Sequence, residues 1–378
     1  MNFEYSNEQL ALQDTLQRFI ARDYGFERRR ELARSPLGFS AEAWGTYAEL
    51  GLLSLPFPEK FGGLGGNAVD IMLVMELVGR GLLLEPFLST LVMGGGLIRD
   101  AASETLQARL LPRIGAGELK LALACHEAGG RYDLAHVACA AVPSGAGWRL
   151  SGQKTVVLDA PSADSFLVSA RTSGNVGDAG GIAVFLVGRE AAGVSLYGYP
   201  TQSGGRAADL RLENAAVDAA ALIGSAQGGL PIVERAVDRG VAALCAEAVG
   251  IMLALNEATL SYLKTRKQFG VPIGSFQALQ HRMADMFIAA EQSRSMAVNA
   301  AVYVDSENAA ERCRAVSAAK AYISQAARLV GQQAVQMHGA MGVVDDVIVS
   351  HYFKRLTMID LALGDGDFHM ARFSDSML

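Results

Sequence analysis

The chain has 378 residues, which is long enough for two or three domains with large buried cores. Hydrophobic residues make up 51% of it and charged residues 19%, a balance that is typical of a globular protein and excludes an intrinsically disordered one. The net charge of -6 argues against a surface that follows phosphate groups, so we expect no nucleic-acid partner.

The ends of the sequence and its cysteines bear on where the protein works. The first residues are acidic and polar, without a basic segment before an apolar one, so we expect no signal peptide. The most apolar stretches, such as residues 240–255, fall short of the roughly 20 residues of a membrane span and contain a charge. Four cysteines lie far apart, without the spacing of metal ligands or of a disulfide scaffold. We therefore expect a cytoplasmic protein with no membrane segment and no metal.

Residues 1–118 are predicted to form a helical domain. Apolar residues recur at helical spacing after Ser6, which is a suitable helix cap, and again after Ser40. The second of these helices stops at the proline- and glycine-rich segment 56–67. Segments 69–83 and 88–102 are apolar on nearly every side, which predicts helices that are buried on several faces.

The pattern changes near residue 119 and again near residue 223. Between them, short apolar or alternating runs are separated by Gly, Ser, Pro and Asn turns, which favours an antiparallel β-barrel domain over 119–222. From residue 223 to 378 the helical period returns and predicts about four long helices of a bundle. The predicted fold class is therefore α+β, with the order helical domain, β domain, helical bundle.

The segment 265–286 carries the clearest chemical pattern. Arg266 lies near the end of one predicted helix, Gly270 stops that helix, and a second helix begins near Phe276. An arginine at a helix terminus, an aromatic ring at Phe269 and an amide at Gln277 could hold a pyrophosphate and a planar ring system. An ordinary helix–turn–helix connection with an exposed arginine accounts for the spacing equally well.

This segment resembles the R-x-x-F-G-x-x-[hydrophobic]-x-x-x-Q signature of the acyl-CoA dehydrogenase family. Residues 58–66, 151–171 and 336–342 resemble the helical-domain turn, the central strands and the late flavin-contacting loop of the same family, in the same order. The resemblance covers the whole chain. It implies a flavoenzyme fold with FAD at a subunit interface and an acyl thioester held against the flavin.

The resemblance also implies which residues contact FAD. From a neighbouring subunit, the diphosphate and adenosine would be approached by Arg266, Gln268, Phe269, Gln336 and Gly339, and Gln277 of the signature would also bind FAD. The segment CHEAGGRYD takes the place of the strand along the flavin, and its contact positions are Cys125, His126, Arg131 and Tyr132. Three of these depart from the family pattern, which has threonine, glycine and serine at 126, 131 and 132. Val156 stands where many members have a tryptophan, so we expect an altered flavin edge.

In this family a carboxylate removes the acyl α proton while the β hydrogen leaves as hydride to flavin N5. Aligned on Arg372, the Y-E-G-T motif that carries this base in many members corresponds to GDGD, which places Asp365 in the base position. Gly366 is then next to the substrate, and Asp367 and His369 face the flavin. A second family solution puts the base on a bundle helix before an arginine, which here is Asp238 before the substrate-contacting Arg239. From the sequence, the base could be Asp365 or Asp238, or this chain could lack a catalytic base.

We expect an FAD-dependent acyl-CoA dehydrogenase of a catabolic, β-oxidation-like pathway, acting on a dicarboxylic, branched or ring-containing acyl-CoA. Electrons would pass to an electron-transfer flavoprotein, and the assembly would be a homotetramer, a homodimer or a heterotetramer with a homologous chain. One alternative is a non-catalytic flavin-binding partner subunit of a heteromeric acyl-CoA dehydrogenase. Another is a flavin oxidase or monooxygenase on the same fold, since relatives that oxidise nitroalkanes also place an aspartate in the base position.

Overall fold

A computed structural model of the chain describes residues 5–377. The chain divides into two compact units, and each combines segments that are distant in the sequence. The helical unit comprises the described residues of Met1–Glu31, Ala68–Leu83 and Val241–Leu378. The sheet unit comprises Leu32–Asn67 and Leu84–Gly240. The three linear domain boundaries expected from the sequence stay a prediction.

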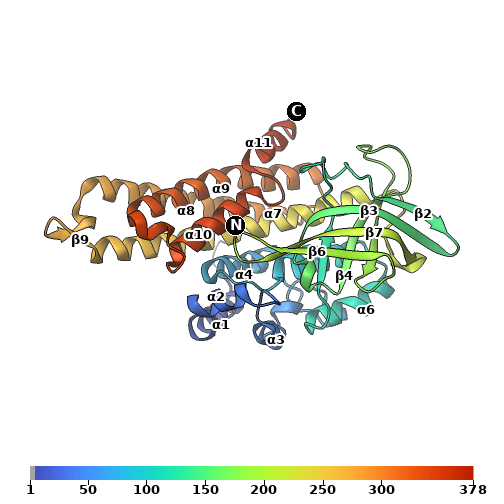
Figure 1. Cartoon of the computed structure of the whole chain (residues 1–378), viewed down its shortest axis with the longest axis horizontal. Helices are drawn as coiled ribbons and strands as arrows, with labels where there is room; N and C mark the ends of the chain where they lie inside the picture. The colour runs from blue at the N-terminus through green and yellow to red at the C-terminus, as the bar shows by residue number, and fades with distance from the viewer. Residues whose placement is uncertain (1–4, 378) are drawn as a thin grey trace. The chain divides into compact units, whose positions relative to one another are not determined.

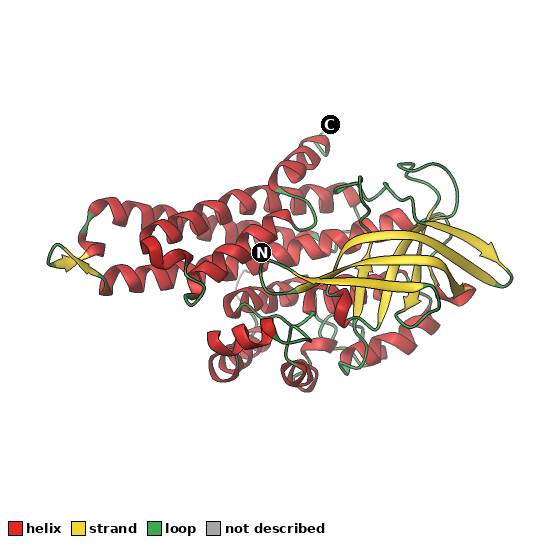
Figure 2. Ribbon diagram, in the orientation of Figure 1, coloured by secondary structure: helices red, strands yellow, loops and turns green. Residues whose placement is uncertain are grey.

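The sheet unit is built on one mixed sheet, drawn in yellow in Figure 2. Its strand order is β6-β7-β3-β2-β4-β5-β8, with β1 paired to β4. The strands are β1 (Leu121–Ala124), β2 (Ala140–Ser144), β3 (Gly147–Leu158), β4 (Ser165–Arg171), β5 (Ile182–Gly188), β6 (Val194–Pro200), β7 (Arg206–Asp218) and β8 (Leu222–Ile223). The predicted β domain is confirmed.

Pairing within the sheet is mostly antiparallel, but β1 and β4 run parallel, as do β2 and β4 where Ala140 pairs with Arg171. This departs from the wholly antiparallel sheet expected from the sequence. The reason is topological: the hairpin β2–β3 lies between β1 and β4 in the sequence, so the chain returns along β4 in the direction of β1. Parallel pairing requires such a long connection.

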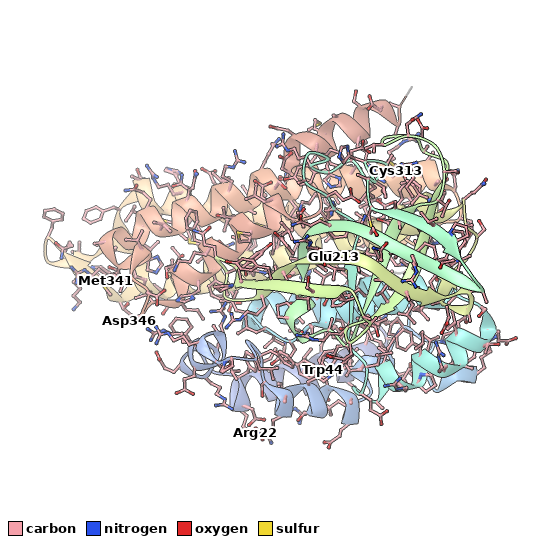
Figure 3. All side chains as sticks on the ribbon, turned by 45° about the vertical axis from the view of Figure 1, so that its right-hand side comes forward. Arg22, Trp44, Glu213, Cys313, Met341 and Asp346 are labelled. Atoms are coloured by element: carbon pink, nitrogen blue, oxygen red, sulfur yellow. The ribbon has the colours of Figure 1, made fainter. Side chains whose placement is uncertain are left out.

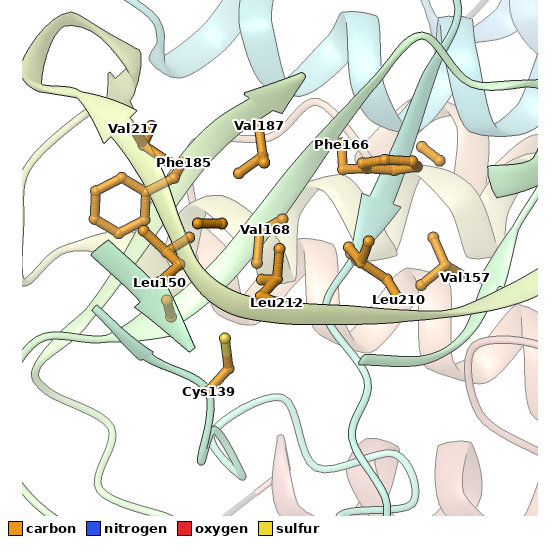
Figure 4. Close-up of a cluster of buried hydrophobic side chains, with 14 of the residues drawn as sticks. Cys139, Leu150, Val157, Phe166, Val168, Phe185, Val187, Leu210, Leu212 and Val217 are labelled. Carbon is orange, nitrogen blue, oxygen red and sulfur yellow. The ribbon is translucent and has the colours of Figure 1, made fainter. Parts of the chain in front are cut away.

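The core of the sheet unit lies between its curved strands, where Phe166, Val168, Phe185, Leu210 and Leu212 meet (Figure 4). Alternate residues of each strand supply these side chains, because successive residues in a strand point to opposite faces. Many of the remaining core residues are alanines, which allows the strands to approach closely. This packed core provides a rigid base for the loops that leave the sheet.

The helices of the sheet unit are α3 (Ala41–Glu49), α5 (Gly96–Ala101), α6 (Glu104–Gly115) and the first part of α7. The predicted cap Ser40 is confirmed, since its hydroxyl accepts a hydrogen bond from the Ala43 amide at 3.1 Å. The segment predicted as one helix over 88–102 instead begins as a π-helix, η3 (Leu88–Gly95), and continues as α5. Wider helical turns let the small residues of Gly94–Gly96 pack against neighbouring side chains.

The helical unit contains the predicted bundle of four long helices, α7 (Gly229–Thr265), α8 (Gln277–Tyr303), α9 (Ala309–His338) and α10 (Ile348–Leu361). The bundle and its hairpin β9 (Lys267–Gln268) and β10 (Val271–Pro272) appear in yellow to red in Figure 1. The unit also holds α1 (Asn7–Asp23), most of α2 (Phe26–Arg34), α4 (Ala68–Gly81) and α11 (Gly366–Asp375). The predicted cap Ser6 is confirmed as half of a capping box with Gln9.

Helix α4 crosses α7 at a pair of glycines. A Cβ atom on Gly79 would lie 2.0 Å from the Glu247 carbonyl oxygen, and one on Gly250 would lie 1.8 Å from the Glu76 carbonyl oxygen. Each glycine therefore lets the backbone of the other helix approach directly. A bidentate ion pair closes the same region, because Arg355 Nε and Nη2 donate to Glu247 Oε1 and Oε2 at 2.5 and 2.7 Å.

Helix α7 is long and apolar enough to cross a membrane by length and composition, but 78% of its most apolar stretch is buried inside the structure. This combination is what the core helix of a bundle requires. The stretch 240–255 that the sequence marks as apolar lies within it.

Candidate functional site

The hairpin after α7 presents an aromatic ring to solvent. Arg266 is the first residue after α7, rather than part of it as the sequence suggested, because the chain turns directly into β9. Gln268 pairs with Val271 across a two-residue turn in which Phe269 and Gly270 have φ of 53° and 82°. These angles are typical of a type I′ hairpin turn. The Phe269 side chain is 91% exposed, with only an edge contact to the ring of Phe276 at 6.2 Å.

A second loop of the helical unit reaches the same end of the bundle. The rings of Tyr262, near the end of α7, and His338, at the end of α9, stack at 4.4 Å. This stacking places the end of α9, with Gln336 and the following Gly339, against the end of α7, which precedes the hairpin. Gln336 and Gly339 are exposed, as are Gln268 and Gln277 of the hairpin region. Met341, labelled in Figure 3, continues this exposed surface.

The sheet unit brings together two further predicted segments. The Thr155 amide donates to the His126 carbonyl oxygen at 2.9 Å, which ties the end of β1 to a bulge in β3 between Lys154 and Val157. At that bulge Val156 has φ of 51° and an exposed side chain, and its amide donates to Asp209 Oδ1 at 3.1 Å. A β-branched residue at positive φ is strained. The bulge thus turns the Val156 side chain away from the sheet core.

A buried ion pair lies beneath this bulge. Lys154 Nζ is completely buried and donates to Glu127 Oε1 at 2.6 Å and to Ser169 Oγ at 2.9 Å. The same carboxylate accepts the amides of Ala138 and Cys139 at 2.7 and 3.0 Å. The pair therefore joins both ends of the 125–139 loop to β3 and β4. The sequence interpretation missed it, because a lysine within an alternating strand is expected on the exposed face.

Cys125 and His126 influence each other's ionisation. Burial raises the pKa of the Cys125 thiol, but the adjacent His126, the Lys154 ammonium and a backbone hydrogen bond together bring the pKa below its usual value. The Cys125 sulfur in turn raises the pKa of His126. Among the residues that the structure describes, the buried Nδ1 atom of His126 has no hydrogen-bond partner. A buried polar atom in this state is suited to a bound ligand.

The remaining predicted residues of the 125–139 loop lie at its outer turn. Arg131 has φ of 48° and an exposed side chain, and its guanidinium lies 5.2 Å from the ring centre of Tyr132. This cation–π contact orients both side chains in the same turn. It provides a cation and an aromatic face where the family pattern has glycine and serine.

Asp365 lies at the N-terminus of α11 and caps that helix. Its Oδ1 accepts the amide of Phe368 at 2.9 Å. The preceding turn is strained, with Leu363 and Gly364 at φ of 57° and 111°. A Cβ on Gly364 would lie 2.5 Å from His369 Nε2, so only glycine fits. Next to Asp365, the Gly366 amide donates to Asp360 Oδ1 at 3.3 Å.

Asp367 and His369 differ sharply in exposure. Asp367 is exposed in the first turn of α11. His369 is only 1% exposed, and its ring nitrogens contact Ser317 Oγ at 3.3 Å and the Leu363 carbonyl oxygen at 3.0 Å. A contact between this imidazole and a flavin would require one of these bonds to be exchanged. The predicted flavin contacts at both residues stay predictions.

Lys320 supports the turn that carries Asp365. Its Nζ atom is completely buried and donates to the Ile359 and Ala362 carbonyl oxygens at the end of α10, the latter at 2.8 Å. Burial lowers the pKa of Lys320 from 10.5 to about 8, partly opposed by Cys245, Asp360 and Asp365. The sequence interpretation missed this residue, because one lysine in an alanine-rich helix resembles a solvent-exposed position.

The alternative base, Asp238, lies on α7 within the sheet unit and is completely buried. Its neighbour Arg239 is also buried and is bonded to Asp100. Arg99 and Arg235 contact the same Asp100 carboxylate at 2.9 and 3.4 Å. Burial raises the pKa of Asp100, but Arg239 and Arg99 together bring it below its usual value. Arg239, the predicted substrate contact, therefore forms an ion pair with Asp100 in this structure, and its contact with substrate stays a prediction.

These residues fit FAD in each unit taken by itself. In the helical unit a cation, amides and an exposed ring lie at one end of the bundle, and Gly339 has positive φ with no atom within 4 Å of its missing Cβ, so the backbone there is open. In the sheet unit the buried Nδ1 atom of His126 has no hydrogen-bond partner within residues 5–377, so it could accept one from a ligand or donate one to it. Among residues 5–377, no three His, Cys, Asp or Glu side chains are grouped to hold a metal ion.

Comparisons with known proteins give matches along most of the chain. Models of the N-terminal, middle and C-terminal domains of acyl-CoA dehydrogenase match residues 6–118, 122–215 and 227–378. Acyl-CoA dehydrogenase FadE27 of Mycobacterium tuberculosis is 30% identical over 92% of this chain and 90% of its own. The probable acyl-CoA dehydrogenase YngJ of Bacillus subtilis is 27% identical over 97% of each chain.

Among solved structures, the ChsE4–ChsE5 complex from Mycobacterium tuberculosis contains a chain that is 28% identical, with a TM-score of 0.90 over 100% of this chain and 99% of its own. The chain belongs to the acyl-CoA dehydrogenase family of FAD-dependent flavoproteins, whose three-part fold it has and whose reaction is the dehydrogenation of acyl-CoA thioesters.

Proposed function

We propose that this chain catalyses the α,β-dehydrogenation of an acyl-CoA thioester with Asp365 as the base. The observation that supports this most directly is the Leu363–Gly364 turn, where Leu363 has positive φ, because it holds in one orientation the carboxylate that the sequence aligns with the Y-E-G-T base. Lys320 and Asp360 hold the two sides of the same turn. A strained backbone segment that neighbouring contacts hold in place is typical of functional sites.

In the proposed reaction the carboxylate of Asp365 accepts the α proton of the thioester, and the β hydrogen departs with its electron pair. FAD, when bound, supplies the acceptor for that hydride. The N-terminal end of α11 favours a negative charge at Asp365 through its amide dipoles. The same capping bond holds the short carboxylate in one orientation, which an aspartate needs when it replaces a longer glutamate.

A second candidate is that the chain is the flavin-holding partner in a two-chain acyl-CoA dehydrogenase. Two observations favour it. Asp365 has a structural task as a helix cap irrespective of catalysis, and the exposed Phe269 hairpin is suited to contact FAD held by another chain. The similar solved chain is part of a complex of two different proteins, ChsE4 and ChsE5. If this chain has the partner role, a homologous chain would supply the base.

Anaerobic bleaching of the flavin by a panel of acyl-CoA thioesters tests the proposal. Asp365→Asn should abolish bleaching while leaving FAD bound, because the amide keeps the shape of the side chain and can no longer accept a proton. Asp238→Asn is the matched control and should bleach at nearly the wild-type rate. If Asp238→Asn is inactive and Asp365→Asn active, the base assignment is wrong.

Two further measurements separate the alternatives. If the purified chain bleaches only after a homologous chain from the same source is added, and the mixture made with Asp365→Asn still bleaches, the partner role is correct and Asp365 is not the base. The dehydrogenase proposal also requires reduced protein to pass electrons to an electron-transfer flavoprotein. Rapid formation of hydrogen peroxide from oxygen without that acceptor would instead identify a flavin oxidase.

A further inference from the structure

The 125–139 loop of the sheet unit, which carries His126, Arg131 and Tyr132, consists of turns and relies on side chains for its shape. Its first part is held by the Glu127–Lys154 pair and by the bond from the Thr155 amide to His126. Its last part is held by the Glu127 carboxylate, which accepts the amides of Ala138 and Cys139, and also by Arg171 at the end of β4. Arg171 is the last residue of segment 151–171, and the sequence pattern of that segment gives it no particular role.

All three guanidinium nitrogens of Arg171 donate hydrogen bonds to backbone carbonyl oxygens. On the loop side, Nε donates to Val137 at 2.8 Å and Nη2 donates to Ala135 at 2.9 Å. On the other side, Nη1 and Nη2 donate to three carbonyls of the turn that follows β4, those of Ser173, Asp178 and Gly180, at 3.3, 3.0 and 2.9 Å. An arginine has five N–H donors, so this set saturates it.

The backbone reinforces the same connection. The Arg171 amide donates to the Cys139 carbonyl oxygen at 2.7 Å, and the Gly177 amide donates to the Ala135 carbonyl oxygen at 3.2 Å. Arg171 and Val137 are buried, so removal of the guanidinium would leave the Val137 carbonyl oxygen without this partner and away from water, whereas Ser173, Asp178 and Gly180 are exposed. A lysine could reach one or two of the five acceptors, because its ammonium is compact and lacks the planar fork.

We propose that Arg171 is a positioning residue for FAD: it holds the 131–139 part of the loop in the shape that binds the cofactor, without touching the cofactor itself. The inference rests on the flavin site described above. It predicts that the loss of Arg171 loosens the Arg131–Tyr132 turn while the His126 end of the loop stays attached through Thr155 and Lys154.

The release of FAD from the purified holoprotein, followed by the rise in flavin fluorescence, tests the proposal. Arg171→Met should raise the dissociation constant for FAD by about 10-fold or more, since bonds from a charged donor are lost. Arg171→Lys should fall between this variant and the wild type. The matched control is Arg189→Met, because Arg189 also donates to carbonyls, those of Ala160, Pro161 and Ala163, but away from the loop. That control should keep the wild-type constant.

Chemical rescue separates positioning from general destabilisation. Guanidinium ions at low concentration should restore FAD affinity to Arg171→Gly and leave Arg189→Gly unchanged. Unchanged FAD release in a folded Arg171→Met or Arg171→Lys variant would overturn the proposal, and so would an equal loss in Arg189→Met. If Arg171→Met does not fold, the Lys variant and the rescue decide the question. Loss of bleaching without loss of FAD in Asp365→Asn concerns only the base, so the two proposals fail separately.

Discussion

The buried ammonium of Lys320 should give the protein an unusual dependence of stability on pH. In the folded chain the pKa of Lys320 is about 8, against 10.5 for an unperturbed lysine. Below pH 8 both the folded and the unfolded states carry the proton, and the folded state bears the full cost of a buried charge. Between pH 8 and 10.5 the folded state loses its proton first, so the unfolded state binds more protons and the free energy of unfolding rises.

The size of the effect follows from the shift. A difference of about 2.5 pKa units corresponds to about 3 kcal/mol, of which about 2 kcal/mol is gained between pH 7 and pH 9.5. The neighbouring Cys245 thiol, whose pKa burial raises to about 12, is present in wild type and variant alike, so its contribution cancels from their difference. Lys320→Met removes the titrating group. The difference in unfolding free energy between wild type and variant should therefore rise by about 2 kcal/mol over that interval.

Urea denaturation at pH 7, 8, 9 and 9.5 measures this difference. The absolute stability of Lys320→Met is less informative, because the variant also loses two hydrogen bonds to the end of α10. Lys60→Met, which removes an exposed lysine paired with Glu104, is the control, and its difference from wild type should stay flat. A change of less than about 0.5 kcal/mol for Lys320→Met would refute the reasoning.

Three further substitutions test packing, charge pairing and backbone strain inside the individual units. Lys154→Met should destabilise the sheet unit by about 3–5 kcal/mol by leaving the Glu127 carboxylate buried alone, and adding Glu127→Gln should recover part of this loss in urea denaturation; equal stability of the single and double variants would contradict it. Gly250→Ala should lower stability by about 2 kcal/mol or more through overpacking, whereas Gly25→Ala, where a Cβ meets no atom within 4 Å, should be nearly neutral in the same assay. Val156→Asn should raise the melting temperature, because asparagine tolerates the left-handed conformation that costs valine about 1–2 kcal/mol, and a fall would count against strain at the bulge.

Local signals in the sequence predicted much of the fold. Ser6 and Ser40 cap the helices that they were expected to cap, and α8 begins directly after Phe276. These features depend on a few neighbouring residues, so a single sequence is enough to reveal them. The sheet-rich middle of the chain follows in the same way from short apolar runs and turn residues.

Features that depend on distant contacts could not be predicted. Lys320 and Lys154 resemble surface lysines in the sequence, and only the fold shows that one ends against α10 and the other against Glu127. The parallel pairing of β1 with β4 depends on the path of the intervening chain. The position of Asp365 was predicted from a motif, but its capping bond to Phe368 is a consequence of how α11 begins.

The hairpin tip at Phe269 also matters for anyone who wishes to stabilise this protein. Asn-Gly is the preferred sequence for a type I′ turn, so replacing Phe269 with asparagine should make the isolated chain more heat-resistant. The same replacement removes the exposed ring that, on the proposed role, another subunit's cofactor requires. A thermostability screen on the separated chain would therefore select variants that assemble poorly, and selection should be applied to the assembled holoprotein instead.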